Sequence, residues 1–188
     1  MQASGFVLAG GASKRMGQDK ALLPYRGTTL VEHVAKTVSE ATGSVALIGD
    51  PGRLGHLGLP VFPDELPSCG PASGIHTALR SSETDWNLVL ACDMPAVSVE
   101  ILRELLRRAE GSDRACVTAT GLYGEPEPLC AVYHRRCLPA LGRSIRDKRL
   151  RMRDFVKEIG AGWVKVDTAA LANVNTPPEW AEFEAKTP

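Results

Sequence analysis

The chain has 188 residues, 44% of them hydrophobic and 23% charged, a balance typical of one globular domain around a single core. Its 22 Lys and Arg residues equal its 22 Asp and Glu residues, so no overall positive field points to nucleic acid or an anionic membrane. No apolar run approaches the roughly 18 residues of a membrane span, and Met1–Gly5 lacks the pattern of a signal peptide. We therefore expect a cytoplasmic protein, with residues 1–188 as one domain, that binds neither nucleic acid nor membrane.

Strands and helices are predicted to alternate through the first 110 residues. Short apolar runs without polar alternation are typical of strands buried on both faces of a parallel sheet. Such runs are Gly5–Ala9, Val45–Ile48, Pro60–Phe62 and Leu88–Ala91. Apolar residues at helical spacing lie between them, at 29–42, at 75–81 after a loop at 63–74, and at 98–110. This alternation argues for βαβ units, in which helices cover a parallel sheet.

Local signals mark the ends of two of these helices. Thr29 and Glu32 fit a capping box, and Gly43 follows the last helical position. Ser98 is placed to cap the helix at 98–110, which Gly111 ends.

Beyond residue 110 we predict two strands, a basic helical region, a last strand and a helix opened by two prolines. These are Ala115–Ala119, Leu129–Tyr133, Arg135–Glu158, Trp163–Val166 and the stretch from Pro177. No linker, repeat or low-complexity segment interrupts the chain. The expected fold class is α/β, a single three-layer Rossmann-like domain with a mostly parallel central sheet.

The five cysteines, Cys69, Cys92, Cys116, Cys130 and Cys137, show no C-x-x-C spacing of the kind that zinc and redox motifs use. Free cysteines pack as small hydrophobic residues, so we expect buried or half-buried thiols. Cys69 is the exception that we do not expect to be inert, because it lies in the loop at 63–74.

A glycine-rich stretch, LAGGASKRMGQDKALL at 8–23, follows the first predicted strand. It is not a Walker loop, because the residue before Lys20 is aspartate, and it is not the G-x-G-x-x-G fingerprint, because Gly10 and Gly11 are adjacent. Adjacent glycines nevertheless let backbone amides approach phosphates, and Lys14, Arg15 and Lys20 add positive charge. The stretch is therefore either a phosphate-binding loop or a solvated turn with incidental cations.

Two lone carboxylates are candidates for the same site. Asp93 follows the apolar run Leu88–Ala91, and ligands of open α/β sheets bind at the carboxyl ends of strands. A carboxylate there is placed to hold Mg²⁺, which takes few protein ligands and keeps phosphates and water as the others. Asp64, in the loop at 63–74, has the weaker position, since lone carboxylates are usually surface residues or caps.

Five segments, in order, resemble one family. The stretch at 8–23 resembles the signature L-A-G-G-x-x-x-R-M-G-x-x-K of nucleotidyltransferases with the nucleotide-diphospho-sugar transferase fold, and within them the molybdenum cofactor guanylyltransferase family. The other four are FPDELPSCGPASGI, similar to its Asp and G-P-x-x-G loop, LACDMP, similar to its C-D-x-P, EPLCAVY, similar to its E-P-L-x-A-x-Y, and NVNTPPEW, similar to its N-x-N-T-P.

This resemblance implies a reaction and a set of residues for it. The reaction is transfer of GMP from Mg-GTP to molybdopterin, which forms molybdopterin guanine dinucleotide and releases pyrophosphate; Mg²⁺ is the implied cofactor. The implied partners are GTP, molybdopterin, cofactor-delivery proteins and molybdoenzymes. The implied catalytic residues are Arg15, Lys20 and Asp93, of which Asp93 is also the metal ligand. The implied nucleotide-binding residues are Leu8, Ala9, Gly10, Gly11, Lys20, Asp64, Gly70, Gly74 and Asp93, and the implied acceptor-binding residues are Asn173 and Asn175.

Some alternatives stay open. Ile48-Gly49-Asp50 stands where the guanylyltransferase pattern often has Asn, which leaves a molybdopterin cytidylyltransferase as a rival, beside a sugar-1-phosphate nucleotidyltransferase and a non-catalytic carrier. Gly70–Gly74 is either a purine-reading loop or a turn before a helix, and Asn173–Asn175 either holds the acceptor or caps the last helix. The cations Lys148, Arg149, Arg151 and Arg153 form either a solvated face or a site for the acceptor's phosphate.

Overall fold

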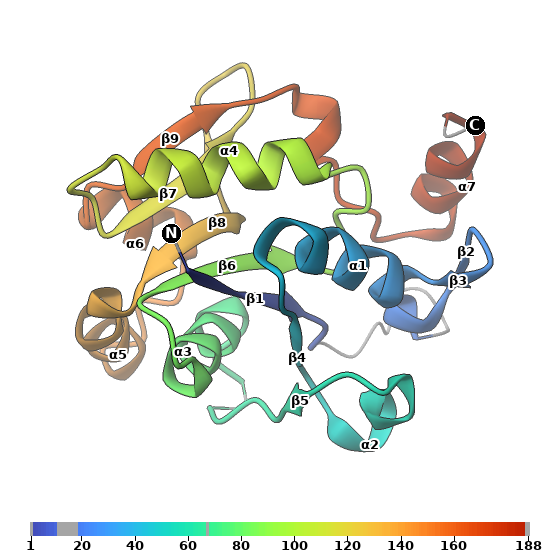
Figure 1. The fold of residues 1–188 in the computed structure, drawn as a ribbon, viewed down its shortest axis with the longest axis horizontal. Helices are drawn as coiled ribbons and strands as arrows, with labels where there is room; N and C mark the ends of the chain where they lie inside the picture. Colours follow the sequence, from blue (N-terminus) through green and yellow to red (C-terminus); the bar gives the residue numbers. More distant parts are fainter. Residues whose placement is uncertain (1, 11–18, 67, 187–188) are drawn as a thin grey trace.

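The computed structural model describes residues 2–10, 19–66 and 68–186, which form a sheet between two layers of helices (Figure 1). The seven strands have the order β5-β4-β1-β6-β8-β7-β9. They are β1 (Ala3–Leu8), β4 (Ala46–Ile48), β5 (Val61–Phe62), β6 (Trp86–Ala91), β7 (Cys116–Thr120), β8 (Pro126–His134) and β9 (Gly162–Lys165). β8 pairs antiparallel with β6 and β7, and the other neighbours pair parallel. The predicted fold class, an α/β domain with a mostly parallel sheet, is confirmed.

Helices cover both faces of the sheet. α1 (Leu30–Thr42) and α4 (Val99–Glu110) lie on one face, and α3 (Pro71–Ser81), α5 (Leu138–Arg146) and α6 (Met152–Glu158) lie on the other (Figure 1). The shorter elements are η1 (Lys20–Leu22), a hairpin of β2 (Pro24–Tyr25) and β3 (Thr28–Thr29), α2 (Pro51–Leu54), η2 (Gly55–Leu57), η3 (Arg135–Cys137) and η4 (Thr168–Leu171). The last helix, α7 (Pro177–Lys186), stands beside the β2–β3 hairpin.

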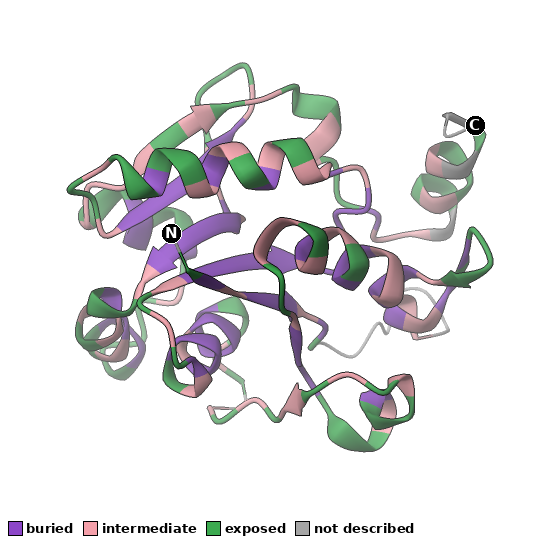
Figure 2. Cartoon of the chain, in the orientation of Figure 1, coloured by how far each residue is buried: buried purple, intermediate pink, exposed green. Residues whose placement is uncertain are grey.

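The central strands are apolar on both faces because both faces are covered. Val7 and Leu88 are fully buried against the α1 and α4 layer, whereas Phe6 and Val89, their neighbours in sequence, are buried against α3 and α5. Successive side chains of a strand point to opposite faces, so a strand between two helical layers needs an unbroken apolar run. Figure 2 shows the buried residues concentrated in these strands and on the inner sides of the helices.

The predicted caps of two helices are confirmed. Thr29 and Glu32 form the full capping box of α1, and Gly43 ends that helix in the left-handed conformation at φ 80°. The side chain of Ser98 accepts a hydrogen bond from the backbone N–H of Ile101 at the start of α4. These signals act over three or four residues, so the sequence around them is sufficient to place them.

The expected loop at 63–74 is shorter than predicted. α3 begins at Pro71, so Gly74 lies inside a helix and Gly70, at φ 59°, is its N-cap. Proline suits the first helical position because its missing N–H would have no helical partner. The basic region Arg135–Glu158 is divided into η3, α5 and α6 rather than forming one helix.

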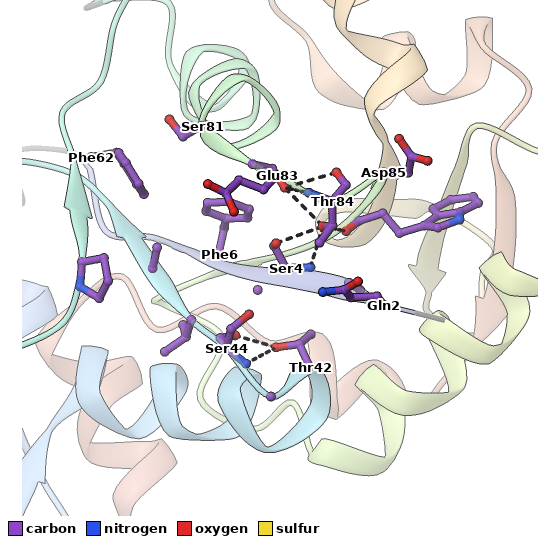
Figure 3. A pocket seen from close by; sticks show the side chains of 18 residues that line it. Gln2, Ser4, Phe6, Thr42, Ser44, Phe62, Ser81, Glu83, Thr84 and Asp85 are labelled. Carbon is purple, nitrogen blue, oxygen red and sulfur yellow. Dashed lines mark hydrogen bonds between the residues drawn. The ribbon is translucent and has the colours of Figure 1, made fainter.

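Strand direction makes the two sides of the sheet at which strands begin and end different. We call the side where β1, β4, β6, β7 and β9 end and β8 begins the carboxyl edge, and the opposite side the amino edge. A groove of about 940 Å³ opens at the amino edge, between the ends of α1 and α3 and the starts of β1 and β6 (Figure 3). None of the described residues that line it is Lys, Arg or His.

Among residues 2–10, 19–66 and 68–186, every helix is too short or too polar to cross a bilayer.

Candidate nucleotide-binding site

Three of the predicted site residues meet at the carboxyl edge of the sheet. The Lys20 ammonium donates to Asp93 Oδ2 at 2.9 Å and to Asn175 Oδ1 at 2.8 Å. The side chains of Lys20 and Asp93 are only 13% and 20% exposed, so the ion pair is largely withdrawn from solvent. Asp93 and Asn175 lie 73 and 155 positions after Lys20 in the sequence, and the fold brings all three side chains together.

Asp93 is placed by the end of the buried strand β6. The backbone N–H of Cys92 donates to Leu8 O at 3.1 Å, which ties the ends of β1 and β6 together. The backbone carbonyl of Asp93 accepts from Val174 N at 2.9 Å, so the C-terminal segment is tied to the same point. The apolar strand therefore delivers its first carboxylate directly to the edge where ligands of parallel sheets bind.

Lys20 is placed by η1, a short turn with its own anchor. Asp19 caps this turn by accepting from Ala21 N, and it also accepts two hydrogen bonds from the Arg53 guanidinium, at 2.7 and 2.6 Å. Ala21 is buried against the core. Arg53 was not among the predicted site residues, because no local pattern links it to an aspartate 34 residues away.

The geometry of Asp93 fits a divalent cation. Its Oδ2 accepts from Lys20, but its Oδ1 is buried and has no hydrogen-bond partner within the described part of the chain. A buried carboxylate oxygen without a partner is costly and is found where an ion or ligand supplies the missing contact. Mg²⁺ takes few protein ligands and keeps phosphates and water as the others, so a single carboxylate is compatible with holding it.

The end of β1 and the first turn of α3 meet beside this site. Leu8 pairs with Ile48 on one side and Ala91 on the other, and Ala9 is buried. At Gly74 an added Cβ would lie 3.2 Å from Leu8 Cδ2, so this glycine lets α3 approach the end of β1 closely.

Gly10 is exposed, and among the described residues an added Cβ would meet Ile48 O alone, at 4.0 Å. The predicted site residues Gly11 and Arg15, together with Lys14, lie outside the described residues.

Asp64 has a structural role that was not predicted. Its Oδ1 accepts hydrogen bonds from the Ser73 hydroxyl and, at 3.2 Å, from Leu66 N. Ser73 is fully buried in the first turn of α3, so the carboxylate ties the preceding loop to that helix. Its predicted contact with the nucleotide stays a prediction, as does that of Gly70.

The two asparagines of Asn173–Asn175 differ in their surroundings. Asn173 is exposed, Val174 between them is 3% exposed, and Asn175 turns toward Lys20. The start of α7 is capped instead by Thr176 and Glu179, since Thr176 Oγ1 accepts from Glu179 N, and Glu179 Oε2 accepts from the backbone N–H of Asn175 and of Thr176. The Asn175 side chain is therefore not needed as the helix cap.

The basic stretch falls into two parts. Arg149 forms ion pairs with Glu158 and Asp147 on the surface, as a solvated face would. Arg151 and Arg153 instead line a pocket of about 420 Å³. Pro71, the first residue of α3, lines the same pocket. Glu127, whose side chain is 13% exposed, also lines this pocket, at the start of β8 and therefore at the carboxyl edge.

The cysteine thiols are buried or half-buried, as expected. All five cysteines are free; four are buried, and Cys69 is half-buried. Burial, reinforced by the Asp93 carboxylate, raises the pKa of Cys92 to about 12, so the thiol beside the site stays protonated and is no nucleophile.

Comparison with known proteins identifies the family of the chain. A family model described as the MobA-like NTP transferase domain matches residues 5–162. A protein of Pelotomaculum thermopropionicum named "Probable molybdenum cofactor guanylyltransferase" is 36% identical over 95% of this chain and 90% of its own length. A Bacillus subtilis protein of the same name is 31% identical over 96% of this chain and 94% of its own length.

A solved structure has the same fold over nearly the whole chain. Molybdopterin-guanine dinucleotide biosynthesis protein A from Archaeoglobus fulgidus superposes with a TM-score of 0.81 at 25% identity, over 97% of each chain. The domain match, the curated relatives and the shared fold all lead to one assignment: the chain belongs to the family of MobA-like NTP transferase domains.

Proposed function

We propose that the protein transfers GMP from GTP to molybdopterin, forming molybdopterin guanine dinucleotide and releasing pyrophosphate. The observation that carries this proposal is the pairing of Lys20 with Asp93 at the carboxyl edge, where a buried carboxylate oxygen lacks a partner. The curated relatives are named for guanylyl transfer on the molybdenum cofactor.

In this reaction a phosphate oxygen of the acceptor attacks the α-phosphorus of GTP, and the bond from that phosphorus to the bridging oxygen of pyrophosphate breaks. The attacking phosphate is already ionised, so no general base is required. Lys20 offsets the negative charge of the phosphates, and Arg15, as the sequence predicts, stabilises the charge that grows on the leaving pyrophosphate.

Asp93 is the residue that would hold a divalent ion, which we propose to be Mg²⁺. Such an ion, when bound, lowers the energy of the negative charge that develops on the transferred phosphate. The role of the protein is to present the unpartnered Oδ1 of Asp93 at a fixed, largely desolvated position.

We propose that the acceptor occupies the pocket lined by Glu127, Arg151 and Arg153, and that Asn173 also contributes to binding it. The cations of this pocket suit a phosphate-bearing acceptor: Arg151 lines it, as do Arg153 and Lys157, which pair with glutamates of the same pocket. We further propose that the chain works as a single domain in the cytoplasm and passes its product to molybdoenzymes, directly or through delivery proteins.

The test is pyrophosphate release from GTP, CTP, ATP and UTP, each with molybdopterin and Mg²⁺. We expect release with GTP and, without molybdopterin, none. Preference for CTP would make the protein a cytidylyltransferase, and binding of GTP and molybdopterin without release would make it a carrier.

A further inference from the structure

The matched family domain ends at residue 162, yet a side chain beyond it reaches the centre of the site. We infer that Asn175 is a positioning residue for Lys20, so that the segment after residue 162 completes the nucleotide-binding site. This inference rests on the proposed function, and it gives Asn175 a role different from acceptor binding.

The contact has the geometry and chemistry of a positioning interaction. Asn175 Oδ1 accepts from Lys20 Nζ at 2.8 Å, as close as the 2.9 Å contact of the same ammonium with Asp93. A lysine side chain loses rotamer entropy when it is fixed, so acceptors that fix it beforehand reduce the cost of binding phosphate. An amide is neutral, so it fixes the ammonium without cancelling the charge that attracts a triphosphate.

Asn175 is itself held from both sides. On one side Val174 is buried, and its backbone N–H donates to Asp93 O at 2.9 Å. On the other side the backbone N–H of Asn175 donates to Glu179 Oε2 at 2.7 Å, in the first turn of α7.

The helix that follows is docked on the hairpin that follows Lys20. The rings of Trp180 and Phe183 lie 5.7 and 5.6 Å from the ring of Tyr25 in β2. Tyr25 is 5% exposed and comes shortly after η1 in the chain, so the two partners of the Lys20–Asn175 hydrogen bond are carried by elements that pack against each other. Figure 1 shows α7 standing beside this hairpin.

The two roles for Asn175 predict different results when no acceptor is present. If Asn175 only contacts molybdopterin, its loss leaves GTP binding unchanged. If it positions Lys20, its loss weakens GTP binding in the absence of molybdopterin, and the effect depends on Lys20.

The experiment is a double-mutant cycle read by calorimetric GTP binding with Mg²⁺ and without molybdopterin, on the wild type, Asn175→Ala, Lys20→Met and the double variant. We expect Asn175→Ala to weaken GTP binding about tenfold, which is about 1.4 kcal/mol. In the Lys20→Met background the same change should have no further effect, because the residue that Asn175 positions is already absent. Asn173→Ala, measured alongside, should raise the KM for molybdopterin while its GTP dissociation constant stays close to the wild-type value.

Asn175→Leu keeps the side-chain volume without an acceptor and should reproduce the loss if Asn175→Ala is poorly folded by circular dichroism. Wild-type GTP binding in folded Asn175→Ala or Asn175→Leu, or an equal loss with and without Lys20, overturns the inference. Pyrophosphate release by the wild type is scored separately. Its absence defeats the proposed function and leaves the binding cycle interpretable.

Discussion

The two edges of the central sheet differ in whether their polar groups have hydrogen-bond partners. At the amino edge the groove is roomy, but its hydroxyl groups bond to one another: Thr84 Oγ1 is hydrogen-bonded to Ser4 Oγ at 2.9 Å and accepts from Ser4 N at 3.0 Å (Figure 3). At the carboxyl edge Asp93 keeps a buried oxygen without a described partner, beside an ammonium. The candidate site is therefore distinguished from the groove by a charged group without a described partner, and not by the volume of a cavity.

Helix direction accounts for part of this difference. α1 and α3 start near the carboxyl edge and end at the groove, where Thr42 and Ser81 are among the lining residues. The start of a helix carries partial positive charge and its end partial negative charge, so a triphosphate is favoured at one edge and disfavoured at the other. The groove also contains Glu83 and Asp85 without a cationic side chain among its described lining residues.

The largest contrast is expected from removing one carboxylate at each edge. Asp93→Asn keeps the shape of the side chain but removes the charge that holds the metal, so we expect at least about a hundredfold lower turnover, roughly 2.7 kcal/mol of barrier. GTP binding should remain measurable, and extra Mg²⁺ or Mn²⁺ should restore only part of the rate. Asp85→Asn at the amino edge is the control and should turn over normally. Near-normal turnover of folded Asp93→Asn at ordinary Mg²⁺ would remove Asp93 from the site.

The two cations of the nucleotide loop should separate binding from turnover. Lys20→Ala should mainly weaken GTP binding, and Arg15→Ala should mainly lower kcat, because charge on the leaving pyrophosphate grows toward the transition state. Each lost charge-assisted contact costs on the order of 1.5–3 kcal/mol. Steady-state kinetics over GTP concentrations from well below to well above KM separates the two parameters. Wild-type activity of both variants at subsaturating GTP would place the triphosphate elsewhere.

α3 allows both edges to be probed by thiol labelling, since Cys69 precedes its start and Ser81 stands at its end. In the native protein at pH 8 we expect iodoacetamide to modify Cys69 ahead of the four buried thiols. GTP should slow modification of Cys69 and leave that of a thiol introduced by Ser81→Cys unchanged, as read by mass spectrometry. Equal protection of both thiols would mean that GTP tightens the whole fold rather than covering one edge.

At the amino edge we expect an effect on stability alone. Thr84→Val removes the hydroxyl that bonds to Ser4 and, at 2.8 Å, to Trp86 O. The expected loss is about 1 kcal/mol, or a fall in Tm of about 2–4 °C for a chain of this size. GTP affinity should not change; a matching loss of affinity would connect the groove to the site.

The smallest effect concerns one histidine at each edge. Burial lowers the pKa of His33, whose Nε2 lies 3.3 Å from Pro95 O, and the pKa of His134 at the end of β8. Stability from the neutral rings is complete above the unfolded pKa of about 6.5 and is lost as the pH falls through the lower folded values. Urea midpoints should therefore be lower at pH 5.5 than at pH 7.5, and less so in His134→Gln. Identical pH dependence in that variant would exclude His134 from the effect.

Local features of the fold were predictable, and distant pairings were not. The capping box at Thr29 and the apolar strand before Asp93 are encoded within a few residues, so their positions followed from the sequence. The entry of β8 between β6 and β7, antiparallel to both, depends on pairing between strands that are far apart in the chain, which periodicity does not specify. The β2–β3 hairpin and α2 were not predicted, because two to four residues are too few for a periodic pattern.

The site shows the same division. The position of Lys20 in the glycine-rich stretch and of Asp93 at the end of a strand indicated phosphate and metal chemistry. Their contact with Asn175 and the anchoring of Asp19 by Arg53 are tertiary facts, for which the sequence carries no local signal. Asp64 looked like a possible ligand. Its hydrogen bond to Ser73 depends on where α3 begins, and the sequence predicted a later start for that helix.

The span between Lys20 and Asn175 also sets an order of events during synthesis. These residues are 155 positions apart, so the ribosome adds residues for roughly 8 to 30 s between them at about 5–20 residues per second. During that interval β1, β4 and β6 can already pair while Lys20 still lacks its amide partner. The nascent chain should therefore acquire its core before it acquires a fully ordered nucleotide site.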